Sequence, residues 1–144
     1  DSAVIFSEIL NYKWFEWKDL INLRHFKLLK REARMSNIDI AFIEGAISTL
    51  EEERLAKKIR KKSKIVIAVG SCAINGAPSN HRNFFDERTL GEISHILKKF
   101  KYRNKVVGVK EIIKVDDEIP GCPADEKTFV EVFEKYIKNF KARD

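Results

Sequence analysis

The sequence predicts an α/β protein built on a mostly parallel sheet, and three observations predict this class. Residues 38–45 and 64–70 are short apolar runs that each stop at a glycine, as buried strands do. The second run is apolar at consecutive positions, which is typical of a strand covered on both faces. Amphipathic helical patterns follow these runs, and strands that alternate with helices indicate βαβ units.

The N-terminal segment predicts a helix followed by an aromatic cluster. Apolar residues recur at helical spacing from the fourth residue onward, at Val4, Ile5, Ile9 and Leu10. Trp14, Phe15 and Trp17 then stand close together. We interpret them as core residues or as a subunit contact, because aromatic residues are enriched in both places. Residues 21–29 alternate in part and predict a strand.

The middle of the chain predicts a strand, a helix and a second strand. Residues 38–45 form the first of these strands and end at Glu44 and Gly45. Ser48 or Thr49 caps the helix that follows, whose first turn is acidic and whose last turn is basic. The strand over residues 64–70 leads into a predicted loop that extends to residue 85.

The C-terminal half predicts two helices around a strand and a loop. Asp86 opens an amphipathic helix that extends to residue 100, and residues 105–115 are strand-like. Residues 116–126 form a loop rich in proline and glycine that contains the second cysteine. The last helix covers residues 125–140, and its inward positions are Phe129, Val132, Phe133, Tyr136, Ile137 and Phe140.

The length, net charge and cysteine content of the sequence limit the class of protein that it encodes. We expect a single domain over residues 1–144, since this length suffices for one core. The net charge of +6 resides mostly on helix-like patterns, so we expect a solvated surface and no nucleic-acid partner. Apolar runs are too short for a membrane span, and two cysteines make no disulfide framework. We therefore expect a cytoplasmic protein, and the abundant Lys, Glu, Arg and Ile fit a thermophile.

The two cysteines, Cys72 and Cys122, are expected at the same edge of the sheet. Right-handed crossovers place the loops after parallel strands on one edge, where α/β proteins bind ligands. Buried thiols, a catalytic cysteine and a zinc site are alternatives, although His81 would give zinc three ligands at best. The segment after residue 70 lacks the Lys-Ser/Thr ending of a phosphate loop.

An iron–sulfur cluster fits the chemistry of these loops better than the alternatives. Thiolates bind iron, and backbone amides in glycine-rich loops donate hydrogen bonds to cluster sulfurs. Gly70, Gly76 and Gly121 allow such close approach, while Pro120 and Pro123 stiffen the second loop.

Three stretches of the chain resemble a known family in order and spacing. They are "IDIAFIEGAIST", "IRKKSKIVIAVGSCAINGAPSN" and "IKVDDEIPGCPADEKTF". They resemble the small, electron-transfer subunit of nickel–iron hydrogenases, above all the short cytoplasmic forms of the sulfhydrogenase, NAD-linked and coenzyme-F420-linked types. The cluster-bearing subunit of respiratory complex I is a more distant match. The resemblance covers most of the chain from Ile38 to Phe129.

The resemblance implies a flavodoxin-like three-layer sandwich that holds the proximal [4Fe-4S] cluster. Cys72 and Cys122 match two of the family's four ligands. The resemblance also implies a large subunit that carries the nickel–iron site, and a further subunit that takes the electrons, because no cysteine-rich segment follows residue 140. The remaining residues expected at the cluster edge are Glu44, Gly45, Gly70, Ser71, Gly121 and Pro123.

One part of the family pattern differs in this chain. When the family's N-terminal C-x-x-C loop is placed on the start of the sequence, Ala3 occupies the position of its second cysteine. The first cysteine then falls before Asp1, and so does the family's first strand. This leaves two further expectations beside the electron-transfer subunit. One is a cluster-less structural or assembly relative, and the other is a flavodoxin-like domain that binds a flavin or nucleotide at the same edge.

Overall fold

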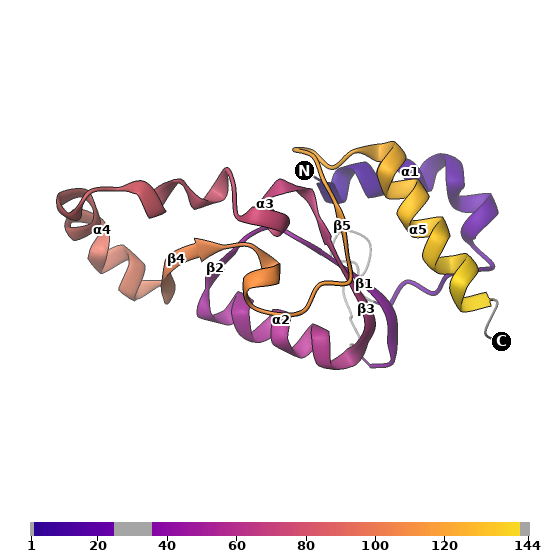
Figure 1. Cartoon of the computed structure of the whole chain (residues 1–144), viewed down its shortest axis with the longest axis horizontal. Coiled ribbons are helices and arrows are strands. Elements are labelled where there is room, and N and C mark those ends of the chain that lie inside the picture. The colour runs from indigo at the N-terminus through magenta and orange to yellow at the C-terminus, as the bar shows by residue number, and fades with distance from the viewer. Residues whose placement is uncertain (1, 25–35, 142–144) are drawn as a thin grey trace.

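The structure, a computed structural model, describes residues 2–24 and 36–141 (Figure 1). Its helices are α1 (Ser2–Trp17), α2 (Leu50–Lys62), α3 (Gly70–Asn75), α4 (Glu87–Lys99) and α5 (Glu126–Lys141). Its strands are β1 (Ile38–Glu44), β2 (Ile47–Thr49), β3 (Ser63–Val69), β4 (Tyr102–Val107) and β5 (Asp117–Ile119). Two short 3₁₀ helices cover Ser79–Phe84 and Val109–Glu111.

The main sheet has three parallel strands in the order β1-β3-β5. The central strand, β3, pairs with β1 along its whole length, and its last three residues pair with β5. Strands β2 and β4 form a separate antiparallel pair. Figure 1 shows α4 and β4 extending to one end of the molecule, while α1 and α5 lie at the other end.

Helices cover both faces of the main sheet, and the alternation of β3 side chains separates two cores. Ile67 and Val69 point into a core formed with α1 and α5. Val66 and Ala68 point into a second core, which receives Ala56 of α2 and Ala73 of α3. All four β3 residues are buried, as the apolar pattern of this strand predicts. The predicted α/β class with a parallel sheet between helices is confirmed.

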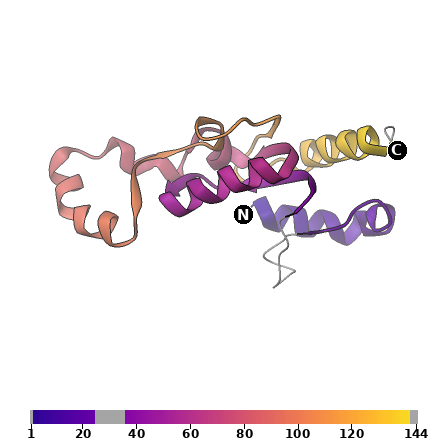
Figure 2. The same ribbon diagram turned by 90° about the horizontal axis from the view of Figure 1, so that it is seen from below.

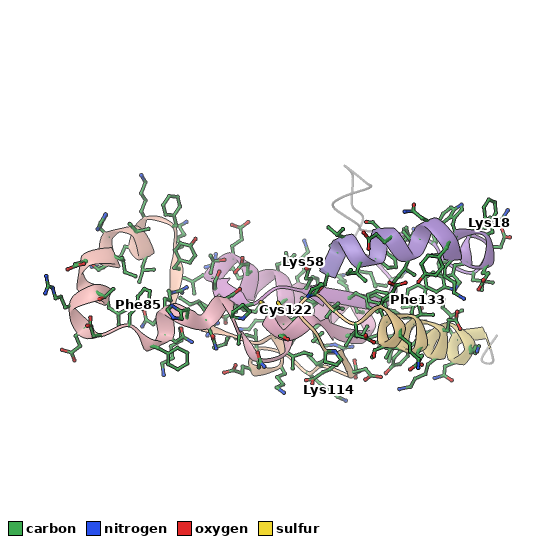
Figure 3. The ribbon with its side chains drawn as sticks, turned by 90° about the horizontal axis from the view of Figure 1, so that it is seen from above. Lys18, Lys58, Phe85, Lys114, Cys122 and Phe133 are labelled. Carbon is green, nitrogen blue, oxygen red and sulfur yellow. The ribbon has the colours of Figure 1, made fainter. Side chains whose placement is uncertain are left out.

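The core between α1 and α5 is largely aromatic. Phe133 of α5 lies with its ring centroid 4.4 Å from that of Trp17 and 5.9 Å from that of Phe6, both on α1. Its ring also lies 5.4 Å from Phe42 of β1 and 6.1 Å from Phe129. Figure 3 labels Phe133 on α5 at the side that faces α1. These rings hold both helices on the sheet, since tilted and stacked aromatic pairs contribute beyond their buried area.

The structure divides the N-terminal aromatic cluster between the core and the surface. Trp17 is 2% exposed and belongs to the core, as one of the two interpretations holds. Phe15 is 80% exposed and Trp14 is 43% exposed. These two side chains point away from the core, which leaves the subunit-contact interpretation open for them.

The helices and strands predicted for the middle of the chain are confirmed in their main features. The predicted strands coincide with β1 and β3, and the capped helix between them coincides with α2. Thr49 accepts a hydrogen bond from the backbone N–H of Glu52, and the Glu52 side chain bonds back to the Thr49 N–H, which makes a capping box. Burial raises the pKa of Glu52, but hydrogen bonds from Ser48 and Thr49 outweigh it and hold the pKa below its ordinary value.

Two segments differ from the sequence prediction. Residues 70–75 form α3, so the first part of the predicted loop is helical. The predicted strand over residues 105–115 is wrong beyond Val107, because Gly108 turns the chain into a 3₁₀ helix. A Cβ at Gly108 would lie 2.4 Å from the carbonyl oxygen of Ile74, so the chain crosses α3 here at backbone contact distance. The third strand of the sheet, β5, lies inside the segment predicted as loop.

The remaining predictions concern three helices and the segment over residues 21–29. The helices predicted at the N-terminus, after Asp86 and at the C-terminus coincide with α1, α4 and α5. For the strand predicted over residues 21–29, residues 21–24 have no regular structure, and the remaining positions lie outside the described residues.

The residues that the structure describes include no helix with the length and apolar character needed to cross a membrane.

An ion pair between Arg60 and Asp116 joins α2, β3 and the segment that leads into β5. Asp116 accepts hydrogen bonds from the Arg60 guanidinium and, at 2.8 Å, from the backbone N–H of Val66. The same guanidinium donates at 2.7 Å to the carbonyl oxygens of Ser63 and Lys64. Burial raises the pKa of Asp116, but these hydrogen bonds and the nearby positive charges outweigh it and lower the pKa.

Replacing Asp116 with asparagine is expected to lower the free energy of unfolding at pH 7 by about 2 kcal/mol, the scale of hydrogen bonds to a charged group. The folded pKa is depressed, so the Asp116 contribution is complete above the unfolded value of about 3.9 and is lost as the pH falls through the folded pKa. Urea unfolding between neutral and acidic pH should therefore show a smaller loss of stability for Asp116→Asn than for the wild type. Asp39→Asn, at an exposed pair with Lys64, is the matched control and should change little. Equal pH slopes for wild type and Asp116→Asn would contradict the assignment.

Candidate functional site

Three chain segments meet at the edge where the strands of the main sheet end. Glu44 is the last residue of β1, Gly70 follows β3 directly, and Gly121 lies two residues after β5. Because the strands are parallel, their carboxyl ends share one edge, and this edge is where α/β proteins usually bind ligands. We call it the thiol edge, since Cys72 and Cys122 follow two of these strand ends.

Hydrogen bonds between neighbouring residues hold the two cysteine-bearing segments together. The backbone N–H of Ser71 donates to the carbonyl oxygen of Gly121 at 2.8 Å, and the Ser71 hydroxyl donates to the same oxygen at 3.1 Å. Each of these residues directly precedes a cysteine. The structure therefore brings Cys72 and Cys122 onto adjoining segments, although they are far apart in sequence.

The two thiols differ in their surroundings. Cys72 lies on α3 and is half-buried, with its Sγ 3.3 Å from the hydroxyl of Ser79. Cys122 is exposed, and Figure 3 labels it near the middle of the molecule. Thiols are the donors that a soft metal or an iron–sulfur centre takes, and both thiols are free.

Glycine is required at two of the predicted positions for different reasons. Gly121 has a φ of 120°, and a Cβ there would lie 2.4 Å from the carbonyl oxygen of Pro123. Gly70 has a φ of 81°, and a Cβ there would lie 2.8 Å from the Ser2 hydroxyl. Gly45 also has a positive φ, of 87°, but a Cβ there would meet nothing within 4 Å. The sequence predicts that Gly70, Gly76 and Gly121 let the backbone approach a cluster closely. In the structure a Cβ at each of these three glycines would lie within 3.3 Å of another protein atom.

Ser2 is a residue of this edge that the sequence did not reveal. It is 6% exposed, and its hydroxyl accepts a hydrogen bond from the backbone N–H of Ala124 at 3.1 Å. The same hydroxyl is the group nearest to a Cβ at Gly70. Ser2 thus joins the start of α1 to the segments after β3 and β5. A single serine at the head of a helix gives no sequence signal for such long-range contacts.

The Glu44 carboxylate also binds the start of α1. One oxygen accepts a hydrogen bond from the backbone N–H of Ser2 at 2.7 Å, and the other accepts from that of Ala3 at 3.1 Å. A carboxylate at this place satisfies helix N–H groups that lack an intrahelical partner and complements the positive end of the helix dipole. Glu44, predicted as a residue that lines a cofactor, therefore positions α1 at the thiol edge.

Asp125 fixes the start of α5 just after the second thiol. Its carboxylate accepts hydrogen bonds from the Thr128 backbone N–H at 2.7 Å and from the Thr128 hydroxyl at 2.6 Å. Both hydrogen bonds lower the pKa of Asp125, and the bond from the Thr128 hydroxyl has the larger effect. The backbone N–H of Asp125 in turn donates to the carbonyl oxygen of Pro120 at 2.9 Å. The turn that carries Cys122 and Pro123 is therefore closed by hydrogen bonds at both ends.

The donors present at the thiol edge make half of the set that a [4Fe-4S] cluster requires. Such a cluster is usually held by four cysteine thiolates, and this chain has Cys72 and Cys122. Within residues 2–24 and 36–141, no group of three or more His, Cys, Asp or Glu side chains is placed to hold a metal ion. His81 instead packs edge-on against the Phe85 ring at 5.7 Å, so the zinc alternative gains no support. The described residues alone do not fit a complete cluster.

Comparisons with curated proteins connect the chain to hydrogenases. It is 35% identical over 104 residues to a subunit of the vhu F420-non-reducing hydrogenase of Methanocaldococcus jannaschii, and this match covers 62% of this chain and 35% of that protein. It is 26% identical over 129 residues to the delta subunit of sulfhydrogenase 2 of Pyrococcus furiosus, and this match covers 87% of this chain and 51% of that protein. The chain therefore spans about a third to a half of the length of these relatives.

Comparison with solved structures supports the fold. A chain of an NAD⁺-reducing [NiFe]-hydrogenase, in a crystal structure of the H₂-reduced state, superposes with a TM-score of 0.79 at 21% sequence identity. The match covers 94% of this chain and 83% of that chain. The profile of the NADH ubiquinone oxidoreductase 20 kDa subunit family matches residues 6–136. The chain therefore belongs to the family of the NADH ubiquinone oxidoreductase 20 kDa subunit and the hydrogenase small subunits.

Proposed function

We propose that this chain is an electron-transfer subunit of a nickel–iron hydrogenase, and that Cys72 and Cys122 are thiolate ligands of its proximal [4Fe-4S] cluster. The observation that carries the proposal is the pair of hydrogen bonds from Ser71 to the Gly121 carbonyl, which joins the two cysteine-bearing segments at one edge. Family membership and the hydrogenase names of the relatives support the same interpretation. The two remaining ligands would have to come from outside this sequence, whose two cysteines are Cys72 and Cys122.

In this proposal the residues around the thiols hold the ligand segments in place. Ser71 ties the segment after β3 to the segment after β5, and Gly121 permits the turn that presents Cys122. Glu44 and Ser2 hold the first turn of α1 against both segments. Pro123 and Gly45 complete the same edge. Each of these roles concerns position, since none of these side chains carries a thiol.

The partners follow from the same proposal. A large subunit that carries the nickel–iron site would cover the thiol edge, where Cys122 is exposed. A further subunit would exchange electrons with this one. The direction of electron flow depends on those partners, because the hydrogen-activating site lies on another chain.

The experiment that tests the proposal measures iron and acid-labile sulfide in the complex purified without oxygen together with its large subunit. About four of each per chain are expected for one [4Fe-4S] cluster. Cys72→Ala and Cys122→Ala should each remove most of this iron, because each substitution deletes a ligand. His81→Ala is the control and should leave the iron content unchanged. Iron that persists in both cysteine variants would contradict the ligand assignment.

A cluster-less hydrogenase-like subunit is the second candidate, and the start of α1 favours it. Ala3 stands where the family has a cysteine, and its N–H is held by Glu44. Ser2 fills the space beside Gly70. This candidate predicts that the wild-type chain co-purifies with a large subunit at normal yield while containing no iron or sulfide.

A further inference from the structure

The exposed face of α2 carries a continuous stripe of positive charge. Five basic side chains recur at helical spacing along this face, and all five are exposed. They also line one shallow hollow of about 290 Å³. We call this set the basic stripe, and it consists of Arg54, Lys57, Lys58, Lys61 and Lys62. Figure 2 shows α2 across the front of the molecule with no other element in front of it, and Figure 3 labels Lys58.

The stripe is unfavourable for the isolated chain. Residues three and four apart on a helix are neighbours, and like charges at these spacings destabilise it. Arg54 and Lys58 form one such pair, and Lys58 and Lys62 form another. Among the described residues only Lys57 of the five forms an ion pair, with Glu53 at 2.5 Å. The other four side chains form no ion pair within the described part of the chain, although Arg54 interacts electrostatically with Glu53.

The helix dipole accounts for only part of this pattern. Cations in the last turn of a helix are favoured, which applies to Lys61 and Lys62. The effect fades within one turn, so it does not apply to Arg54, which lies in the first half of α2. Arg60, also in the last turn, points instead into the network with Asp116. The stripe therefore extends beyond the last turn, where the helix dipole favours cations.

We propose that the basic stripe is a docking surface for an acidic protein. Its five charges extend over eight residue steps, about 12 Å, which is longer than a single phosphate group. Helix α2 has no aromatic residue on which a nucleic-acid base could stack. A row of exposed cations without an apolar centre suits a partner that associates rapidly through opposite charge and remains sensitive to salt.

The position of the stripe allows this partner to bind independently of the thiol edge. Helix α2 ends at Lys62, and the next residue begins β3. The last turn of α2 therefore lies at the edge where β3 starts, opposite the edge where Cys72 follows it. An acidic partner on the stripe leaves the thiol edge accessible, and the proposal holds whether or not that edge carries a cluster.

The test uses the full chain and a fluorescein-labelled helical peptide with five glutamates at the same spacing. Binding is followed by fluorescence anisotropy at low salt and at 0.15 M salt, with a duplex DNA as the comparison probe. The stripe variant is Arg54→Gln, Lys58→Gln and Lys62→Gln together. The matched control is Arg88→Gln, Lys98→Gln and Lys99→Gln together, which removes the same residue types from exposed positions of α4.

The stripe variant is expected to bind the peptide at least about tenfold more weakly, while the control changes affinity by less than about threefold. Glutamine is a good helix former and its introduction removes repulsion, so the stripe variant should keep or raise its melting temperature. A loss of binding therefore cannot come from unfolding if the melting temperature is maintained. Equal weakening by both variants overturns the proposal, and so does a stripe variant that loses DNA binding but retains the peptide.

Discussion

Replacing Phe133 with alanine is expected to lower the free energy of unfolding by about 3–5 kcal/mol, a large share of the stability of a domain this size. Phe133 is 5% exposed, and its ring packs against Phe6 and Trp17 of α1. Removing it deletes these contacts and leaves a cavity that its aromatic neighbours cannot fill without leaving their own sites. Urea unfolding followed by tryptophan fluorescence measures the change, because Trp17 lies beside the deleted ring.

Phe84→Ala is the matched control for this substitution. Phe84 is 77% exposed, so the same change of side chain should shift the free energy of unfolding by less than about 0.5 kcal/mol. Equal effects at the two positions would show that Phe133 does not hold α1 and α5 together. A further expected effect is loss of order at the start of α1, because Ser2 and Ala3 keep their place only while α1 remains on the sheet.

Replacing Gly121 with alanine is expected to destabilise the fold by about 2–4 kcal/mol and to disturb the thiol edge. The φ of 120° is unfavourable for alanine, and the new Cβ would lie 2.4 Å from the backbone oxygen of Pro123. A backbone atom cannot move aside as a flexible side chain can. The Gly121 carbonyl, which accepts both hydrogen bonds from Ser71, would have to shift. Urea unfolding and the rate of Cys122 alkylation measure the two effects.

Substitutions at two other glycines separate the two causes of this loss of stability, the positive φ and the steric clash. Gly45→Ala tests a positive φ without a clash, because nothing lies within 4 Å of its Cβ position, and about 1 kcal/mol of destabilisation is expected. Gly91→Ala lies within α4 with open space around it and should raise stability by about 0.5–1 kcal/mol. If Gly121→Ala behaves like Gly91→Ala, the close contact with Pro123 is not a constraint on the fold.

The elements that could be predicted from sequence are those whose local signals agree with their tertiary role. The strand β3 has apolar residues at consecutive positions because helices cover both of its faces. Helix α2 could be located because Thr49, an acidic first turn and a basic last turn mark both its ends. Helix α5 shows its buried face directly, with Phe129, Phe133 and Ile137 in the core.

The elements that the sequence misplaced depend on contacts with distant segments. The strand β5 consists of Asp117, Glu118 and Ile119, a composition that disfavours strands, and it forms because β3 offers an open edge. The apolar residues after Gly108 suggested a longer strand, yet the chain forms a 3₁₀ helix over Val109–Glu111, and Val109 and Ile113 enter the second core. No local pattern distinguishes these outcomes.

The thiol edge could be predicted in part. The glycine-bounded end of the strand over residues 64–70 pointed to Cys72, and parallel topology predicted that Cys122 lies at the same edge. The strand that leads to Cys122 is β5, which the sequence predicted as loop. The contacts of Ser2 and Glu44 were not predictable, because they arise only when α1 is placed across the ends of the strands. Glu44 lies at the end of β1, and its carboxylate accepts hydrogen bonds from backbone N–H groups of α1.

The two thiols reach the thiol edge through the formation of two different strand pairs, and these pairs differ in their loop-closure entropy. Pairing of β3 with β1 joins residues 25 positions apart, such as Ile38 and Ser63, whereas pairing with β5 joins Ile67 to Asp117, 50 positions apart. Closing the longer loop costs more conformational entropy, and the three residue pairs between β3 and β5 contribute little stabilisation to offset that cost. We expect β5 to form after the β1–β3 pair and to open first in native-state hydrogen exchange. The segment that carries Cys122 would then be the last part of the thiol edge to become ordered during folding. It would also be the part that opens most readily when a partner or a metal centre is assembled.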